Sequence, residues 1–217
     1  MDMYPLQSKK RVLYVGAHPD DIEIGSAGSI IKSNTQSQSI KQAATTFSKC
    51  ETNSGLDFTA EELMTDMQAS MKVMGIPWEN VSTFNFPNTR LPEFTYEIRT
   101  TLEQIRDTYH PNVVYLPSEH DTHQDHVAVA HACKRAFRGS EELRCYEVGA
   151  TTREFRPNLY VDITEQMDKK VEALMCYSTQ LERQRFSDIY WRARATLRGY
   201  SVGFRYVEAF EILKQLA

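Results

Sequence analysis

The stretch RVLYVGAHPDDIEIG, from Arg11 to Gly25, decides the fold of this 217-residue chain. Its apolar, β-branched first half, Arg11 to Ala17, is typical of a buried strand, and the pattern from Gly25 to Ile31 indicates a helix. The polar cluster between them, which runs from His18 to Asp21, is therefore expected on a strand-to-helix loop. Ligands of open α/β sheets bind outside the carboxyl ends of the strands, where such loops lie.

A second polar cluster follows a later strand pattern in the same way. The apolar run Asn112–Pro117 precedes the segment DTHQDH, Asp121 to His126, and Val127–Ala136 then has a helical pattern. His126 should therefore lie near the start of a helix. Because both clusters follow strands, we expect the two loops to face one site at the same edge of the sheet.

The rest of the chain alternates between strand and helix patterns, which predicts an α/β domain spanning residues 1–217, with a mainly parallel sheet and helices on both faces. Thr59 and Glu62 form a capping box before an apolar helical stripe. A second stripe ends before Pro111. The remaining expected features are a strand over Asn158–Ile163, a helix capped by Thr164 that runs to Tyr177, a strand or short helix over Tyr206–Leu213, and loops or lids over Pro87–Pro92 and Ser178–Tyr200.

The first cluster suits a metal better than a dinucleotide. Its glycines lack the G-x-G-x-x-G spacing, and its acids would repel a pyrophosphate unless a cation lay between them. Two imidazoles and a carboxylate are typical ligands of a catalytic zinc, which keeps one position for water. His18, Asp21 and His126 supply this set, and Asp20 beside them is a candidate general base.

These residues carry a resemblance to a known family. The segments AHPDDIEIG, Ala17–Gly25, and D-x-H-x-D-H, Asp121–His126, resemble the PIG-L or LmbE-like zinc-dependent de-N-acetylases, and Lys169–Gln180 and Arg192–Ile212 are similar to the family's closing segment. The resemblance implies a Rossmann-like enzyme that removes an N-acetyl group from an N-acetylglucosamine conjugate.

The resemblance also implies a role for each residue. His18, Asp21 and His126 would bind the metal, which we expect to be Zn²⁺, although Fe²⁺ or Co²⁺ also suits such ligands. Asp20 would activate water, and His123 would be the cationic partner of the oxyanion, with Asp125 holding its ring. A neighbouring carboxylate of this kind raises the pKa of a histidine.

The chain departs from the family pattern on the substrate side. No basic residue lies between Lys49 and Lys72, whereas many relatives have an arginine after the second strand. The segment Phe47–Asn53 occupies that place. Ile22 also stands where the common AHPDDE form has glutamate, with Glu23 one position later. These differences leave the expected chemistry intact and affect substrate recognition.

Composition narrows the class of partner. The net charge of −4 argues against binding to nucleic acid or to an anionic membrane, because both are negatively charged. We therefore expect a small-molecule or glycoconjugate substrate. No window approaches the about 18 apolar residues of a membrane span, and the first residues lack a signal-peptide pattern, so we expect a cytoplasmic protein. The four cysteines are scattered and are expected to be free thiols: Cys50, Cys133, Cys145 and Cys176. Cys50 is the exception to consider, because it lies in the loop expected on the substrate side.

The basic and aromatic segment Ser178–Tyr200 has two interpretations. It could form a solvated amphipathic helix, or it could line the sugar pocket or a contact in a homo-oligomer, because Trp, Tyr and Arg favour buried contacts. Among the remaining histidines, His120 is expected at the rim of the site, and His110 and His131 are expected to be structural or exposed.

Other functions remain open at this point. Asp20, Asp21 and Glu23 could share two metal ions and cleave a phosphoester. The His-carboxylate-His set could hold non-haem iron for oxygen chemistry. The protein could also act on a different N-acyl small molecule, or be a binding module that has lost catalysis, although the presence of Asp20 and His123 beside the ligands argues against the last option. The residues together favour a metal-dependent amidohydrolase.

Overall fold

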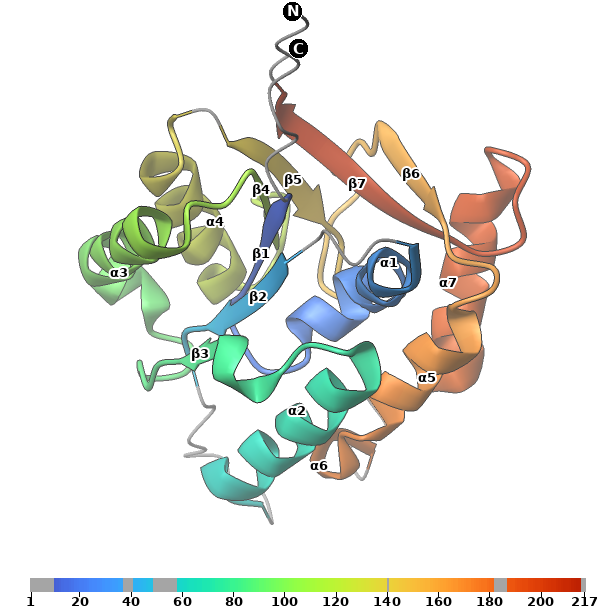
Figure 1. Cartoon of the computed structure of the whole chain (residues 1–217), viewed down its shortest axis with the longest axis horizontal. Helices are drawn as coiled ribbons and strands as arrows, with labels where there is room; N and C mark the ends of the chain where they lie inside the picture. The colour runs from blue at the N-terminus through green and yellow to red at the C-terminus, as the bar shows by residue number, and fades with distance from the viewer. Residues whose placement is uncertain (1–9, 37–40, 49–57, 140, 182–186, 216–217) are drawn as a thin grey trace, which may run out of the picture.

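The computed structural model describes residues 10–36, 41–48, 58–139, 141–181 and 187–215. Within them, the strands form a seven-stranded sheet in the order β3-β2-β1-β4-β5-β7-β6 (Figure 1). The strands are β1 Arg11–Gly16, β2 Lys41–Thr46, β3 Val81–Thr83, β4 Val113–Pro117, β5 Glu142–Tyr146, β6 Leu159–Asp162 and β7 Val207–Lys214.

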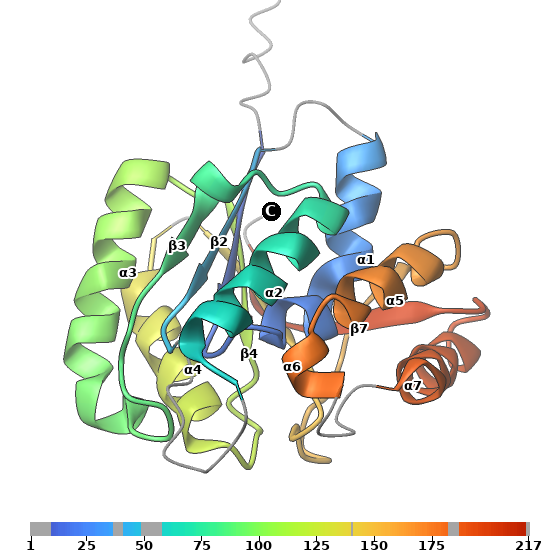
Figure 2. The same ribbon diagram turned by 90° about the horizontal axis from the view of Figure 1, so that it is seen from below.

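Helices cover both faces of this sheet, as the two perpendicular views show (Figures 1 and 2). Helices α3 and α4 lie on one face, and α1, α2 and α5 lie on the other. The helices are α1 Asp21–Gln36, α2 Ala60–Met74, α3 Thr95–Tyr109, α4 Gln124–Ala136, α5 Met167–Met175, α6 Ser178–Leu181 and α7 Asp188–Tyr200, with short 3-10 turns η1 Trp78–Asn80 and η2 Leu91–Phe94. None of these described helices is both long and apolar enough to cross a bilayer.

The sheet has a reversal of strand order beside β1. The chain passes from β1 to β2 and β3 on one side, and then returns to β4 on the other side of β1. Strands β1 to β5 pair in parallel, whereas β7 is antiparallel to both of its neighbours. This arrangement confirms the predicted α/β fold with a mainly parallel sheet. The carboxyl ends of the two strands beside such a reversal, here β1 and β4, are the usual ligand site of these sheets.

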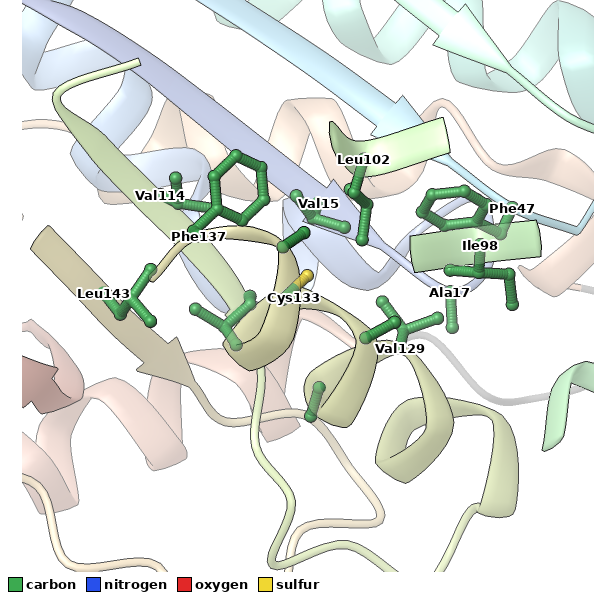
Figure 3. Close-up of a cluster of buried hydrophobic side chains, with 14 of the residues drawn as sticks. Val15, Ala17, Phe47, Ile98, Leu102, Val114, Val129, Cys133, Phe137 and Leu143 are labelled. Carbon is green, nitrogen blue, oxygen red and sulfur yellow. The ribbon is translucent and has the colours of Figure 1, made fainter. Parts of the chain in front are cut away.

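Successive side chains of strand β1 point to opposite faces of the sheet, and helices bury them on both faces. Leu13 and Val15 pack with the residues of α3 and α4, and Val12 and Tyr14 pack with α1, α2 and α5. Figure 3 shows Val15 among the side chains of the first of these clusters. The near-continuous apolar run that identified this strand in the sequence is thus explained by its central position.

Several local predictions are confirmed. Thr59 and Glu62 form the expected capping box at the start of α2. Helix α3 ends at Tyr109, where His110 takes a left-handed conformation before Pro111. The segment that could have been a strand or a short helix is strand β7.

Other predictions are wrong. Helix α1 begins at Asp21 rather than Gly25, so the second acid of the polar cluster already belongs to the helix. Thr164 does not cap α5, because its amide and its hydroxyl both donate to the carboxylate of Asp162. The segment Ser178–Tyr200 is not a loop or lid, because its described part contains helices α6 and α7. This agrees with the alternative interpretation as an amphipathic helix, with Trp191 and Ala195 of α7 buried.

Helix α1 lies unusually close to the sheet. A Cβ atom on Gly25 would lie 2.3 Å from Cδ2 of Tyr146, and one on Gly28 would lie 2.7 Å from Cγ2 of Ile163. Both contacts are shorter than real Cβ atoms allow. Glycine at these two positions therefore lets the helix that carries Asp21 approach β5 and the end of β6.

A buried ion pair fixes α1 in this position. The carboxylate of Glu208 on β7 accepts hydrogen bonds from the amides of Gly28 and Ser29, each 2.8 Å long. It also accepts one of 2.6 Å from Lys170 on α5, and Lys170 donates another to the carbonyl of Ile24. The pair therefore joins α5 and β7 to the middle of α1.

We expect the substitution Glu208→Leu to lower the free energy of unfolding by about 3–5 kcal/mol, because it leaves a buried ammonium group and two backbone amides without their acceptor. Urea unfolding followed by circular dichroism measures this change. The control is Glu103→Gln, which removes a partly exposed pair with Arg99 on α3 and should cost less than about 1 kcal/mol. Equal losses in the two variants would contradict the structural role of Glu208.

Candidate metal centre

Two loops meet at the carboxyl ends of β1 and β4. His18 follows β1, and Asp21 is the first residue of α1. His126 lies in the first turn of α4, which His123 caps. The acids and histidines of both loops thus come together at the reversal of strand order, as the sequence predicted for a shared site.

His18, Asp21 and His126 form a compact, buried group with metal-ligand character. Nδ1 of His18 lies 3.3 Å from Nε2 of His126 and 3.6 Å from Oδ2 of Asp21. Nε2 of His126 lies 3.2 Å from Oδ1 of Asp21. Two ligands of a tetrahedral zinc ion, each about 2.0–2.2 Å from the metal, lie roughly 3.3 Å apart. The spacing of these side chains therefore fits one divalent ion.

Each of the two imidazoles has a carboxylate at its other nitrogen. Nε2 of His18 lies 3.0 Å from Oδ2 of Asp125, and Nδ1 of His126 lies 3.2 Å from Oδ1 of Asp121. The contact between His126 and Asp121 is close but lacks hydrogen-bond geometry, and the hydrogen bonds that Asp121 accepts come from Thr151 and from the backbone amide of His123. A carboxylate behind the histidine is the usual outer partner in metal sites, where it fixes the ring orientation and makes the ligand more basic.

The electrostatics of the group also favour a cation. Burial lowers the pKa of His18, but hydrogen bonds to Asp125 and Asp21 outweigh it and raise this pKa to about 9. Burial likewise lowers the pKa of His126, and the adjacent carboxylates of Asp21 and Asp121 raise it to about 10. The pKa of Asp21 is lowered, since the two histidines outweigh burial. The surrounding carboxylates thus favour positive charge between His18 and His126, where Nδ1 of one ring faces Nε2 of the other.

Asp20 has an unusual backbone. Its φ of 98° lies in the left-handed region, which residues other than glycine rarely adopt. Burial, followed by the charge of Asp21, raises the pKa of its carboxyl well above the usual range. Two consecutive carboxyl groups therefore have pKa values shifted in opposite directions, as expected when one binds a cation and the other accepts a proton.

The position of Asp125 corrects a detail of the sequence interpretation. Its carboxylate does not hold the ring of His123. It accepts hydrogen bonds from His18 and from the amides of Thr89 and Leu91, while its backbone amide donates to Nδ1 of His123. The charge of Asp125 raises the pKa of His123, as the sequence interpretation expected, but it does not decide the net shift. Burial and the charges of His18 and His126 lower this pKa and outweigh the effect of Asp125.

The hydrogen bond to His123 has a chemical consequence. Because Nδ1 accepts from the amide of Asp125, a neutral His123 carries its proton on Nε2. The ring lies with its centroid 4.7 Å from those of both His18 and His126. A neutral His123 ring next to His18 and His126 can therefore donate a hydrogen bond from Nε2.

The other predicted residues lie further out. His131 is exposed and pairs with Glu119, and His110 ends α3 on the surface, as expected. His120 is partly exposed on the same loop as the second cluster. Cys133, Cys145 and Cys176 are free thiols, whereas Cys50 and most of the segment Phe47–Asn53 lie outside the described residues.

Asp121 is the site residue to which sequence analysis gave no role. The first position of the D-x-H-x-D-H motif was the available signal, because it places a carboxylate before a predicted ligand. The loop Pro87–Pro92 was expected as a loop or lid, but its contact with Asp125 through Thr89 and Leu91 could not be inferred from local pattern.

We expect Asp121→Ala to weaken zinc affinity about 10–100-fold, the usual effect of losing the outer partner of a metal-bound histidine. Competition with a chelator of known affinity measures this change. Glu119→Ala provides the control, because Glu119 lies on the same loop but pairs with Lys134 and His131 away from the ligand group. Unchanged affinity in the Asp121 variant would show that this carboxylate does not support a metal ligand.

Comparison with known proteins agrees with this geometry. A family model described as PIG-L, GlcNAc-PI de-N-acetylase, matches residues 13–137, which include both loops. The diacetylchitobiose deacetylase of Thermococcus kodakarensis is 25% identical, and the match covers 96% of this chain and 85% of that protein.

Solved structures with the same fold carry more than one activity. The N,N'-diacetylchitobiose deacetylase of Pyrococcus horikoshii has a TM-score of 0.78 at 20% identity, covering 97% of this chain and 87% of the other. The 4-carboxy-2-hydroxymuconate hydratase of Pseudomonas putida has a TM-score of 0.76 at 18% identity, covering 96% and 98%. At these identities the likeness shows the shared fold alone.

Proposed function

The chain belongs to the PIG-L family of de-N-acetylases, and on this premise we propose that it removes the acetyl group from an N-acetylglucosamine-type sugar conjugate, releasing acetate and a free amine. The observation that carries the proposal is the group of His18, Asp21 and His126 at the ends of β1 and β4, inside the region that matches the family. The deacetylase relative from Thermococcus, which matches along nearly the whole chain, supports the same reaction class.

We assign the metal to His18 Nδ1, His126 Nε2 and the carboxylate of Asp21. This donor set suits Zn²⁺, and Fe²⁺ and Co²⁺ are the alternatives. When bound, such an ion polarises an acyl oxygen and lowers the pKa of a coordinated water. Asp125 accepts a hydrogen bond from the other nitrogen of His18, and the carboxylate of Asp121 lies 3.2 Å from the other nitrogen of His126.

Asp20 is the proposed general base. Its raised pKa makes its carboxylate a stronger proton acceptor than an ordinary aspartate, and it lies next to the metal ligand Asp21. It takes a proton from the water that attacks the acetyl carbonyl. The same carboxyl then returns the proton to the leaving nitrogen, so that the free amine and acetate are formed.

His123 is the proposed partner of the oxyanion. Its lowered pKa leaves it neutral near pH 7, and its Nε2–H can donate a hydrogen bond to the oxygen that gains charge in the tetrahedral intermediate. Because a neutral ring has no spare proton, the protonation of the amine falls to Asp20 rather than to His123. This division differs from the cationic role suggested by the sequence.

The phosphoesterase alternative gains no support from the site. It requires the carboxylates of Asp20, Asp21 and Glu23 to share two ions. Glu23 is instead fully buried and accepts a hydrogen bond from Tyr177. Among the described residues, it belongs neither to the group of His18, Asp21 and His126 nor to the other candidate ligand group, which consists of His18, His123 and Asp125. An amidase for another N-acyl molecule, the non-haem iron site, and the cytoplasmic location stay predictions.

The first test is release of free amine and acetate from a panel of N-acetylglucosaminides by the zinc-loaded protein. We expect turnover that a chelator abolishes. Asp20→Ala should bind zinc normally and lose about 10²–10⁴-fold in kcat, the usual contribution of a general base. Asp21→Ala should lose the metal. Elemental analysis of each variant separates the two effects.

Two results would contradict this assignment. Normal zinc content in Asp21→Ala would exclude Asp21 as a ligand, and full activity of Asp20→Ala would exclude it as the base. Absence of amine release from every sugar, with zinc bound, would reject the proposed substrate class and direct the search to other N-acyl compounds.

Helix α7 offers a surface for self-association. Among the described residues, exposed large apolar side chains gather on α7 and the turn after it; they include Ile189, Leu197, Tyr200 and Phe204, which are 81%, 70%, 89% and 52% exposed. The arginines of α7 are paired with Asp168, Asp188 and Glu147, so they add little free charge. We propose that a second copy of the chain covers this face.

The oligomer proposal predicts a mass above that of the monomer in light scattering at micromolar concentration. Leu197→Asp should shift the protein toward the monomer, because it places a charge in a contact that excludes water. Tyr96→Asp is the control, since Tyr96 is a similarly exposed apolar residue on α3. A monomeric wild-type protein would refute the proposal.

A further inference from the structure

Thr89, in the loop between β3 and α3, has a strained backbone. Its φ of 64° lies in the left-handed region, which β-branched residues rarely adopt. A residue keeps such a conformation only where the surrounding structure holds it. Specific contacts must therefore fix the Thr89 peptide.

The first turn of α4 holds this residue by both of its backbone polar groups. The amide of Thr89 donates a hydrogen bond of 2.7 Å to Oδ2 of Asp125, and its carbonyl accepts one of 2.8 Å from Nε2 of Gln124. The amide of Leu91, two residues later, donates to Oδ1 of Asp125 over 3.0 Å. Two consecutive residues of α4, Gln124 and Asp125, thus hold the loop.

The same carboxylate contacts a proposed metal ligand. Oδ2 of Asp125, which accepts from Thr89, also lies 3.0 Å from Nε2 of His18. Asp125 is 0% exposed, so bulk water does not compete for its oxygens. One backbone amide on each oxygen gives the carboxylate a fixed orientation. Its position in turn sets the orientation of the His18 ring, because a carboxylate at the second nitrogen orients a metal-binding imidazole.

A displaced Asp125 would therefore act on the ligand group. Nδ1 of His18, at the other side of the ring, lies 3.3 Å from Nε2 of His126. Because an imidazole is rigid, a shift of Nε2 of His18 moves its Nδ1 as well. The spacing of the two proposed ligands thus depends on the loop that fixes Asp125.

We propose that Gln124 and Thr89 are positioning residues for the metal site. Gln124 holds the Thr89 peptide in its left-handed conformation, and the Thr89 amide fixes the carboxylate of Asp125. This carboxylate then orients His18. The inference rests on the metal site proposed above, and it assigns no chemical step to Gln124 or Thr89.

Amide hydrogen exchange at Thr89, followed by NMR in the zinc-loaded protein, tests the first link. Gln124→Ala should speed this exchange about fivefold or more, because the loss of a hydrogen bond to the Thr89 carbonyl lets the strained peptide open. The matched control is Thr122→Ala. Thr122 is likewise exposed on the polar segment that contains Gln124, and its hydroxyl donates to the backbone carbonyl of Ala150 rather than to Thr89.

Zinc affinity, measured by competition with a chelator, tests the link to the metal. Gln124→Ala should weaken it about tenfold, the lower end of the usual effect of losing the outer partner of a metal ligand. Thr122→Ala should leave it unchanged. A loop contact without influence on His18 would change the melting temperature and not the zinc affinity, and circular dichroism establishes that each variant is folded.

Two further backgrounds show whether the effect passes through Thr89 and Asp125. Glycine is unstrained in the left-handed region, so in Thr89→Gly the added change Gln124→Ala should weaken zinc affinity less than about threefold. Asp125→Ala has already lost the connection to His18. In that background Gln124→Ala should change the affinity less than about twofold.

The results separate this inference from the proposed function. Unchanged exchange at Thr89 or unchanged zinc affinity in Gln124→Ala overturns the positioning role, and so does an equal loss of affinity in all three backgrounds. A wild-type protein that binds no zinc rejects the inference together with the metal site. One that binds zinc and hydrolyses no N-acetyl sugar rejects only the proposed function, while the affinity measurements still decide the role of Gln124 and Thr89.

Discussion

The parallel pairing of β1 with β4 is the constraint on which the site depends. The register Val12 to Val113, Leu13 to Val114 and Tyr14 to Tyr115 brings the ends of two strands that are distant in sequence to the same edge of the sheet. Helices leave these ends in opposite layers, α1 on one face and α4 on the other. Side chains from both loops meet between these helices, and the buried apolar core on each face of β1 keeps the register from slipping.

The site alternates carboxylate and imidazole groups. His18 and His126 each stand between an inner carboxylate, Asp21, and an outer one, Asp125 or Asp121. Buried carboxylates are costly unless they are paired or bind a cation, so three of them around two imidazoles form a stable group chiefly when positive charge is shared among them. Asp125 links this group to the loop that contains Thr89, because its carboxylate accepts hydrogen bonds from both the Thr89 amide and His18.

The sequence predicted what depends on local pattern. The apolar run of β1, the capping box at Thr59, and the two polar clusters are short-range signals, and the ligand group followed once both clusters were expected at strand ends. Contacts between distant elements have no such signal. The Lys170–Glu208 pair on α1, the bond from Tyr177 to Glu23, and the pairing of Asp125 with His18 rather than His123 each depend on packing that brings together residues far apart in the chain.

The fold alone does not determine the reaction, since a hydratase shares it at a TM-score of 0.76. The chemistry depends on the pKa values of the individual carboxyl groups at the site. Asp20 and Asp21 are consecutive carboxyls with the same intrinsic pKa, yet the histidines lower the pKa of one while burial and its neighbour raise the pKa of the other. Asp20 lies in a left-handed conformation after β1, whereas Asp21 is the first residue of helix α1. One dipeptide can thus supply both a permanently charged ligand and a proton acceptor, which is what hydrolysis of an amide by an activated water requires.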